Sequence, residues 1–163
     1  MGTGRAATRG AMKTLLIVDV QRAFQVPPAL VQRIERYAAR FDRRVFTRFV
    51  NPRGSLFRTK LKRQCCAPGS KDTELLLKPG PRDIVITKDG YGLKPVHLRK
   101  LSRLGVRSVT VCGIDTDACV LGVMFSLFDA GITCRAREDL CWSSAGLHSP
   151  AMKIIREQFP RSR

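Results

Sequence analysis

A single carboxylate interrupts the first strongly apolar stretch of the chain. Asp19 lies in the run Leu15–Gln21, LLIVDVQ, whose other members are mostly aliphatic. A charge buried in such surroundings is costly unless an opposite charge or several hydrogen bonds compensate it. Asp19 is therefore a candidate general acid or base whose pKa is tuned by burial and by a nearby cation. A buried ion pair without a catalytic role is the alternative interpretation.

Lys88 is the matching cation. It directly follows the apolar stretch Asp83–Thr87, DIVIT, and precedes the loop Asp89–Gly92. Asp19 and Lys88 can neutralise each other whether or not they catalyse anything. Their pairing alone therefore does not distinguish a catalytic site from a structural ion pair.

Cys119 is the candidate nucleophile among six cysteines. Its predicted position near the start of a helix favours a thiolate, because the helix dipole and free N–H groups stabilise negative charge there. An inert buried thiol is the alternative, and we expect it for the three cysteines in or beside apolar stretches, Cys112, Cys134 and Cys141. The adjacent Cys65 and Cys66 lie in a basic loop, where exposure alone would make them reactive.

Apolar, β-branched stretches alternate with helical patterns along the chain. The predicted strands are Thr14–Val20, Arg44–Val50, Asp83–Thr87, Arg107–Cys112 and Ile132–Arg137. The predicted helices are Pro28–Asp42, Pro95–Leu104, Thr116–Ala130 and Ser149–Phe159, with a short one at Asp72–Lys78 in the irregular, basic segment 51–81. This alternation predicts an α/β protein, a three-layer α/β/α fold with a mainly parallel, Rossmann-like sheet of five or six strands. Such sheets carry their sites at the carboxyl ends of the strands, so Asp19, Lys88 and Cys119 should meet at one edge.

Three segments together resemble the isochorismatase-like cysteine hydrolases, which include N-carbamoylsarcosine amidohydrolases and nicotinamidases. The segments are Leu16–Phe24 (LIVDVQRAF), Ile86–Tyr91 (ITKDGY) and Val111–Val120 (VCGIDTDACV). The resemblance implies that Cys119 is the nucleophile, Asp19 the proton acceptor and Lys88 the cation that completes a triad. It also implies a cis peptide bond between Ile114 and Asp115, and an oxyanion hole formed by the backbone N–H groups of Asp115 and Cys119.

The reaction implied by this resemblance is cleavage of an amide- or imide-type C–N bond through a thioester acyl-enzyme. The substrate would be a small molecule, and an anionic substrate fits this expectation. Candidate pocket residues are Gln21, Phe24, Tyr91, Thr116 and Trp142, although the aromatic ones suit an ordinary core equally well. The stretch Thr47–Pro52 lacks the acid and histidine with which nicotinamidases hold zinc. We therefore expect no catalytic metal and no cofactor.

The bulk composition describes a globular protein of 163 residues with a net charge of +17. We expect a flexible basic tail at residues 1–12 and a single domain at 13–163. Six cysteines without a signal peptide indicate a reducing, cytoplasmic location, and no apolar run is long enough to cross a membrane. The resemblance implies a homo-oligomer, a dimer or tetramer.

The positive charge is concentrated in one part of the chain. Residues 41–71 hold nine lysines and arginines against one acid, Asp42. We favour a solubilising surface that also guides an anionic substrate, and nucleic acid is a less favoured partner because no recognised nucleic-acid motif accompanies the charge. The alternative function is a catalytically silent protein of this fold that acts as a basic binding module for anionic partners or nucleic acid. The short connection between Phe24 and Pro28, where relatives build a pocket wall, keeps that alternative open.

Overall fold

The computed structural model describes residues 12–159 and contains one five-stranded parallel sheet. Its strands are β1 (Thr14–Val18), β2 (Arg43–Phe49), β3 (Ile84–Lys88), β4 (Ser108–Ile114) and β5 (Thr133–Trp142). Their order across the sheet is β3-β2-β1-β4-β5, so the chain runs outward in one direction from β1 and then returns to its other side at β4. Ligands bind at such reversal points in α/β sheets, beyond the carboxyl ends of the strands.

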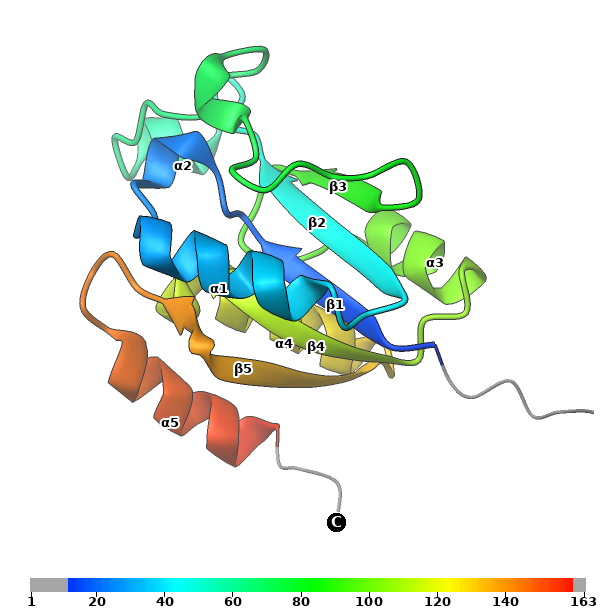
Figure 1. Cartoon of the computed structure of the whole chain (residues 1–163). Helices are drawn as coiled ribbons and strands as arrows, with labels where there is room; N and C mark the ends of the chain where they lie inside the picture. Colours follow the sequence, from blue (N-terminus) through cyan, green and yellow to red (C-terminus); the bar gives the residue numbers. More distant parts are fainter. Residues whose placement is uncertain (1–11, 160–163) are drawn as a thin grey trace, which may run out of the picture.

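Helices cover both faces of this sheet. They are α1 (Pro28–Ala38), α2 (Leu56–Thr59), α3 (Pro95–Arg103), α4 (Leu121–Asp129) and α5 (His148–Gln158), with short turns η1 (Arg22–Phe24), η2 (Lys71–Thr73) and the π-helical η3 (Thr116–Val120). Figure 1 shows α1 and α5 in front of the sheet, with α3 and α4 behind it. The predicted three-layer α/β/α fold is thus confirmed.

The irregular segment between β2 and β3 differs from the sequence-based prediction. The helix predicted at Asp72–Lys78 is wrong, because only η2 forms there, Glu74 is extended and Leu75 makes an isolated antiparallel bridge with Gln21. The Leu76 N–H donates to the Val20 carbonyl at 2.9 Å, which holds this stretch alongside the residues that follow β1. A short helix forms earlier instead, as α2, where the Ser55 hydroxyl accepts from the Arg58 N–H.

The described part of the chain also bears on two further expectations. Within residues 12–159, no helix is long and apolar enough to cross a membrane. All six cysteines lie in this range and are free thiols. The predicted N-terminal tail of residues 1–12 lies, apart from Met12, outside the described residues.

Gly113 lets the two central strands approach each other at their carboxyl ends. It has a φ of +117°, and a Cβ atom added to it would lie 2.2 Å from the Val18 carbonyl oxygen. Val18 is the last residue of β1 and pairs with Gly113 of β4. A side chain at this point would push apart the two strands whose ends carry Asp19 and, one short turn later, Cys119.

Gly113→Ala is therefore expected to destabilise the fold by about 3 kcal/mol or more, because it combines an unfavourable φ with a backbone clash. Gly131→Ala is the matched control, since Gly131 also has a positive φ of +73° but nothing within 4 Å of the added Cβ. The control should cost only about 1–2 kcal/mol. Urea unfolding of both variants measures their free energies of unfolding. Equal losses of unfolding free energy would show that the close approach of Gly113 to Val18 does not contribute to the cost.

Candidate active site

Asp19 is the first residue beyond β1 and is almost fully buried. It adopts a left-handed φ of +48°, which is uncommon for a residue other than glycine. Thr47 of the neighbouring β2 holds it at two points. The Asp19 N–H donates to the Thr47 hydroxyl oxygen at 3.1 Å, and that hydroxyl donates to the Asp19 carboxylate at 2.6 Å. The carboxylate is thus fixed at the sheet edge by its neighbour strand.

Lys88 ends β3 and reaches across β2 to the same carboxylate. Its Nζ lies 2.7 Å from Asp19 Oδ2, and both side chains are essentially inaccessible to solvent. The ammonium passes 5.4 Å from the centre of the Phe49 ring and donates to the Gly90 carbonyl at 2.7 Å. Burial alone would lower the pKa of Lys88, but attraction to the Asp19 carboxylate raises it above the ordinary value. The lysine is therefore a permanent cation at neutral pH.

Cys119 lies in η3, two residues before α4 begins, and is half-buried. Burial raises the pKa of its thiol well above the ordinary value, the Asp19 carboxylate raises it further, and Lys88 only partly offsets both. The expectation of a resting thiolate, drawn from the nearby helix start, is therefore wrong. Desolvation and the adjacent carboxylate outweigh the stabilising effect of the lysine. The protein holds a neutral thiol beside a base that can accept its proton.

The segment between β4 and Cys119 is held by residues that follow β5. The peptide bond between Ile114 and Asp115 is cis. The Asp115 carboxylate accepts hydrogen bonds from the Ser144 N–H at 2.8 Å and from the Ser144 hydroxyl at 3.0 Å. Behind it, the Thr116 hydroxyl lies 2.9 Å from His148 Nδ1 at the start of α5. These contacts hold the backbone that leads into η3.

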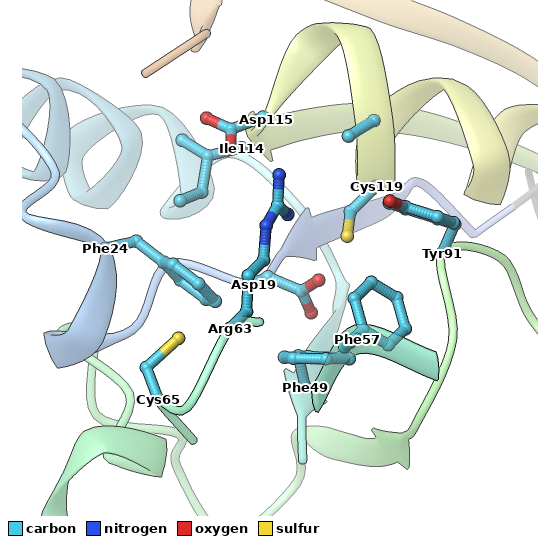
Figure 2. A pocket seen from close by; sticks show the side chains of 11 residues that line it. Asp19, Phe24, Phe49, Phe57, Arg63, Cys65, Tyr91, Ile114, Asp115 and Cys119 are labelled. Carbon is cyan, nitrogen blue, oxygen red and sulfur yellow. The ribbon is translucent and has the colours of Figure 1, made fainter. Parts of the chain in front are cut away.

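A cavity opens where these groups meet, and the empty space between its lining atoms is about 410 Å³, part of it open to solvent. In Figure 2 the Cys119 sulfur and the Asp19 carboxylate point toward the same space, with Phe24 on one side and Phe57 and Tyr91 on the other. The lining residues are Asp19, Phe24, Phe49, Phe57, Arg63, Cys65, Tyr91, Ile114, Asp115, Ala118 and Cys119. The Phe57 ring is 4.9 Å from those of both Phe49 and Tyr91, so these three rings form a continuous wall.

Three of the candidate pocket residues are absent from this cavity's described lining. Gln21 is buried and bonds the main chain of Phe49, accepting from its N–H at 2.7 Å and donating to its carbonyl at 3.0 Å. Thr116 is buried against His148. Trp142 ends β5, pairs with Ile114 and packs on the core. Their roles in the structure are to support the site, whereas Phe24 and Tyr91 line it.

Sequence reasoning missed Phe49, Arg63 and Cys65 as parts of the cavity. Phe49 had a readable signal, because it lies one residue before the end of the predicted strand Arg44–Val50 and so near the same sheet edge as Asp19 and Lys88. Arg63 and Cys65 had none, since they belong to the irregular segment after β2. Their position depends on the conformation of that segment, which no periodic pattern predicts.

Comparison with known proteins places this site in a family. A model of the isochorismatase domain matches residues 13–160. The chain belongs to the isochorismatase family. This is a hydrolase family with amidase relatives, and the family that the sequence motifs resemble is thereby confirmed. None of the curated protein sequences matches the chain.

Solved structures share the fold of this isochorismatase-family protein over nearly its whole length. The pyrazinamidase of Pyrococcus horikoshii in complex with zinc is 18% identical, with a TM-score of 0.79 over 91% of this chain and 96% of that one. The nicotinamidase from Bacillus subtilis is 15% identical, with a TM-score of 0.77 over 93% and 98%. The N-carbamoylsarcosine amidase from Thermoplasma acidophilum is 16% identical, with a TM-score of 0.73 over 90% and 94%. At these identities the likeness establishes the fold.

The donor groups around the cavity do not suit a zinc ion like that of the pyrazinamidase. Within residues 12–159, no group of three or more histidine, cysteine, aspartate or glutamate side chains is placed to hold a metal. Asp19, the carboxylate nearest Cys119, is already bonded to Lys88 and Thr47. No step of the chemistry below is therefore assigned to a metal.

Proposed function

We propose that this isochorismatase-family protein is a cysteine hydrolase that cleaves an amide- or imide-type C–N bond of a small molecule. One observation carries the proposal. The Asp19 carboxylate, held by Lys88 at 2.7 Å and by Thr47 at 2.6 Å, lies beside the neutral Cys119 thiol at the wall of a small aromatic cavity. A nucleophile, a base and an orienting group are the parts that covalent acyl transfer requires.

In the first half of the reaction, Asp19 accepts the thiol proton as the Cys119 sulfur attacks the substrate carbonyl carbon. The carbonyl electrons move to oxygen, and the backbone N–H groups of Asp115 and Cys119 stabilise the oxyanion. One such donor typically contributes about 2.7–4 kcal/mol to the transition state. When the C–N bond breaks, Asp19 returns its proton to the leaving nitrogen, which departs as ammonia or an amine.

Water completes the cycle. Asp19 takes a proton from water as the oxygen attacks the thioester carbon, the C–S bond breaks, and the proton returns to sulfur. Lys88 keeps its charge throughout, and its Nζ lies 2.7 Å from the Asp19 carboxylate that exchanges the proton. The raised pKa of the Cys119 thiol suits this scheme, because proton transfer then accompanies attack and no thiolate needs to accumulate.

The test is to trap the acyl-enzyme on Cys119. The protein is incubated with nicotinamide, pyrazinamide and N-carbamoylsarcosine, the compounds suggested by its structural relatives, and with simple amides such as benzamide. We expect ammonia release with at least one of them, and an acid-quenched enzyme whose Cys119 peptide carries the mass of the acyl group. Added hydroxylamine should divert that group to a hydroxamate. Hydrolysis without an adduct on Cys119 would overturn the covalent mechanism, and no hydrolysis of any compound would favour the binding-module alternative.

A further inference from the structure

Arg63 brings a positive charge to a cavity wall whose other members are aromatic, aliphatic, small or acidic. Both carboxylates of that wall have partners, since Asp19 binds Lys88 and Asp115 binds Ser144. Within residues 12–159, the Arg63 guanidinium makes no ion pair and no hydrogen bond. In Figure 2 its side chain rises along the cavity, and the guanidinium is seen between Phe24 and Cys119, beside Ile114 and below Asp115.

The main chain of Arg63 is held in place by a buried amide. Asn51, the second residue after β2, is fully buried, and its Nδ2 donates to the Arg63 carbonyl at 2.9 Å and to the Cys65 carbonyl at 3.1 Å. The Arg63 N–H donates to the Phe57 carbonyl at 2.8 Å, and the Asn51 N–H donates to the Cys66 carbonyl at 2.7 Å. These hydrogen bonds fix the main chain of the loop so that Arg63 lies at the cavity wall, although its side chain is exposed to solvent.

Other cations of the basic segment 41–71 bind partners elsewhere in the protein. Arg44 pairs with Asp83 at 2.7 Å, and the Arg43 guanidinium donates to the Leu104 carbonyl at 2.8 Å. The Arg58 guanidinium donates to the Asn51 carbonyl at 3.0 Å, and Lys62 donates to the Thr59 carbonyl at 2.9 Å. Among the nine lysines and arginines of this segment, Arg63 is the member that lines the described cavity.

We propose that Arg63 binds a carboxylate of the substrate, so that the protein selects small amides or imides that carry an acidic group away from the scissile carbonyl. This inference rests on the proposed cysteine hydrolase function and names the substrate class of the same site. A guanidinium presents two parallel N–H donors that match the two oxygens of a carboxylate, and it keeps its charge at every physiological pH. Phe24, Phe57 and Tyr91 then contact the apolar part between the carboxylate and the reacting carbonyl.

The test compares two alkylating reagents of nearly equal shape that differ in charge. Iodoacetate and iodoacetamide both form an S–C bond to cysteine with loss of iodide. Rate constants for Cys119 are measured at pH 9 by peptide mass spectrometry in the wild type, Arg63→Ala, Arg63→Lys and Lys60→Ala. Lys60 is the matched control, an exposed cation of the same loop that does not line the cavity. The iodoacetamide rate reports whether each variant keeps a folded site and a reactive thiol.

We expect Arg63→Ala to lower the ratio of the iodoacetate rate to the iodoacetamide rate at Cys119 by about tenfold, through loss of the charged partner. Arg63→Lys should restore part of the ratio, because lysine keeps the charge but lacks the two-pronged geometry. Lys60→Ala should leave it within about twofold. An unchanged ratio in Arg63→Ala, or an equal fall in Lys60→Ala, overturns the role of Arg63 and leaves the hydrolase proposal standing. If neither reagent labels Cys119 in the wild type even after prolonged incubation, Asp19 does not take up the thiol proton as the sulfur attacks an electrophile, and both proposals fail.

Discussion

Replacing Cys119 by alanine is expected to abolish turnover, with kcat/KM for ammonia release falling by at least about four orders of magnitude. The acyl-enzyme cannot form without the sulfur, and the remaining groups only bind and polarise the substrate. Stability should change little, because the thiol is half-buried at the wall of a cavity that solvent can enter. Steady-state kinetics and urea unfolding of the same preparation separate the two effects.

Cys134→Ala is the matched control for this variant. Cys134 lies on β5, is buried, and its sulfur is 3.5 Å from the Met124 carbonyl oxygen, within the core rather than at the cavity. Its replacement should cost about 1 kcal/mol of stability and leave kcat/KM within about twofold. Retained activity in Cys119→Ala would instead mean that Asp19 activates water for direct attack on the substrate, and the covalent mechanism would have to be abandoned.

Replacing Asp19 by asparagine is expected to remove both activity and stability. The variant has no base for the thiol proton, so turnover should fall below about one thousandth of the wild-type rate. It also leaves the Lys88 ammonium buried without a counter-charge, which should cost about 3–5 kcal/mol of unfolding free energy. Lys88→Met creates the converse defect. The double variant Asp19→Asn/Lys88→Met should recover most of the stability and none of the activity.

The Arg44–Asp83 ion pair offers the control for this cycle. It has a similar N–O distance of 2.7 Å, but Arg44 is partly exposed and the pair lies away from the cavity. Asp83→Asn should therefore cost only about 1–2 kcal/mol and leave kcat/KM unchanged. If the double variant were as unstable as Asp19→Asn, the loss would come from packing around Asp19 and not from an uncompensated charge.

The pH dependence of stability gives a second check on the Asp19–Lys88 pair. The pKa of Lys88 is raised in the folded state, so the folded protein holds this proton more tightly than the unfolded chain does. The stabilisation is therefore complete below the ordinary lysine pKa of about 10.5 and is lost as the pH rises through the folded value. The unfolding free energy of the double variant is subtracted from that of the wild type at each pH. This difference should be constant from pH 7 to about 9 and should fall above about pH 10.5. A difference that grew over that alkaline range would contradict the pairing.

Much of the fold and of the reactive centre could be predicted from the sequence, for an identifiable reason. The strands are short apolar runs between turn residues, and a parallel arrangement brings their carboxyl ends to one edge. Asp19, Lys88 and Cys119 each follow or end such a run. The order and direction of the strands therefore bring these three residues together, and the exact conformation of the loops has little effect on it. Gln21 follows such a run too and nevertheless makes supporting contacts, because the rule places a residue at the edge without giving the direction of its side chain. Trp142 reaches the same edge only because β5 extends to it, beyond the predicted strand Ile132–Arg137.

Phe24 and Tyr91 were predicted as wall residues, but the part of the wall formed by the loop after β2 could not be predicted, because it depends on side-chain bonds to the main chain. Phe57, Arg63 and Cys65 reach the site because Asn51 and the Phe57 carbonyl fix the loop that carries them. The protonation state of Cys119 was missed for a related reason. A helix start was visible in the sequence, whereas the desolvation and the adjacent carboxylate that raise the thiol pKa exist only once the chain is folded.

The buried Asn51 amide has a consequence for how such a protein can diverge. The groups proposed to react come from the ends of β1 and β3 and from the turn after β4, whereas much of the selective wall belongs to the single loop 52–65 that this amide fastens at its far end. Chemistry and selectivity are thereby encoded in separate stretches of the gene. Exchange of one short peptide between two fixed anchors could redirect the enzyme to a new substrate without disturbing the reacting atoms, and the same exchange is a practical route to engineered specificity.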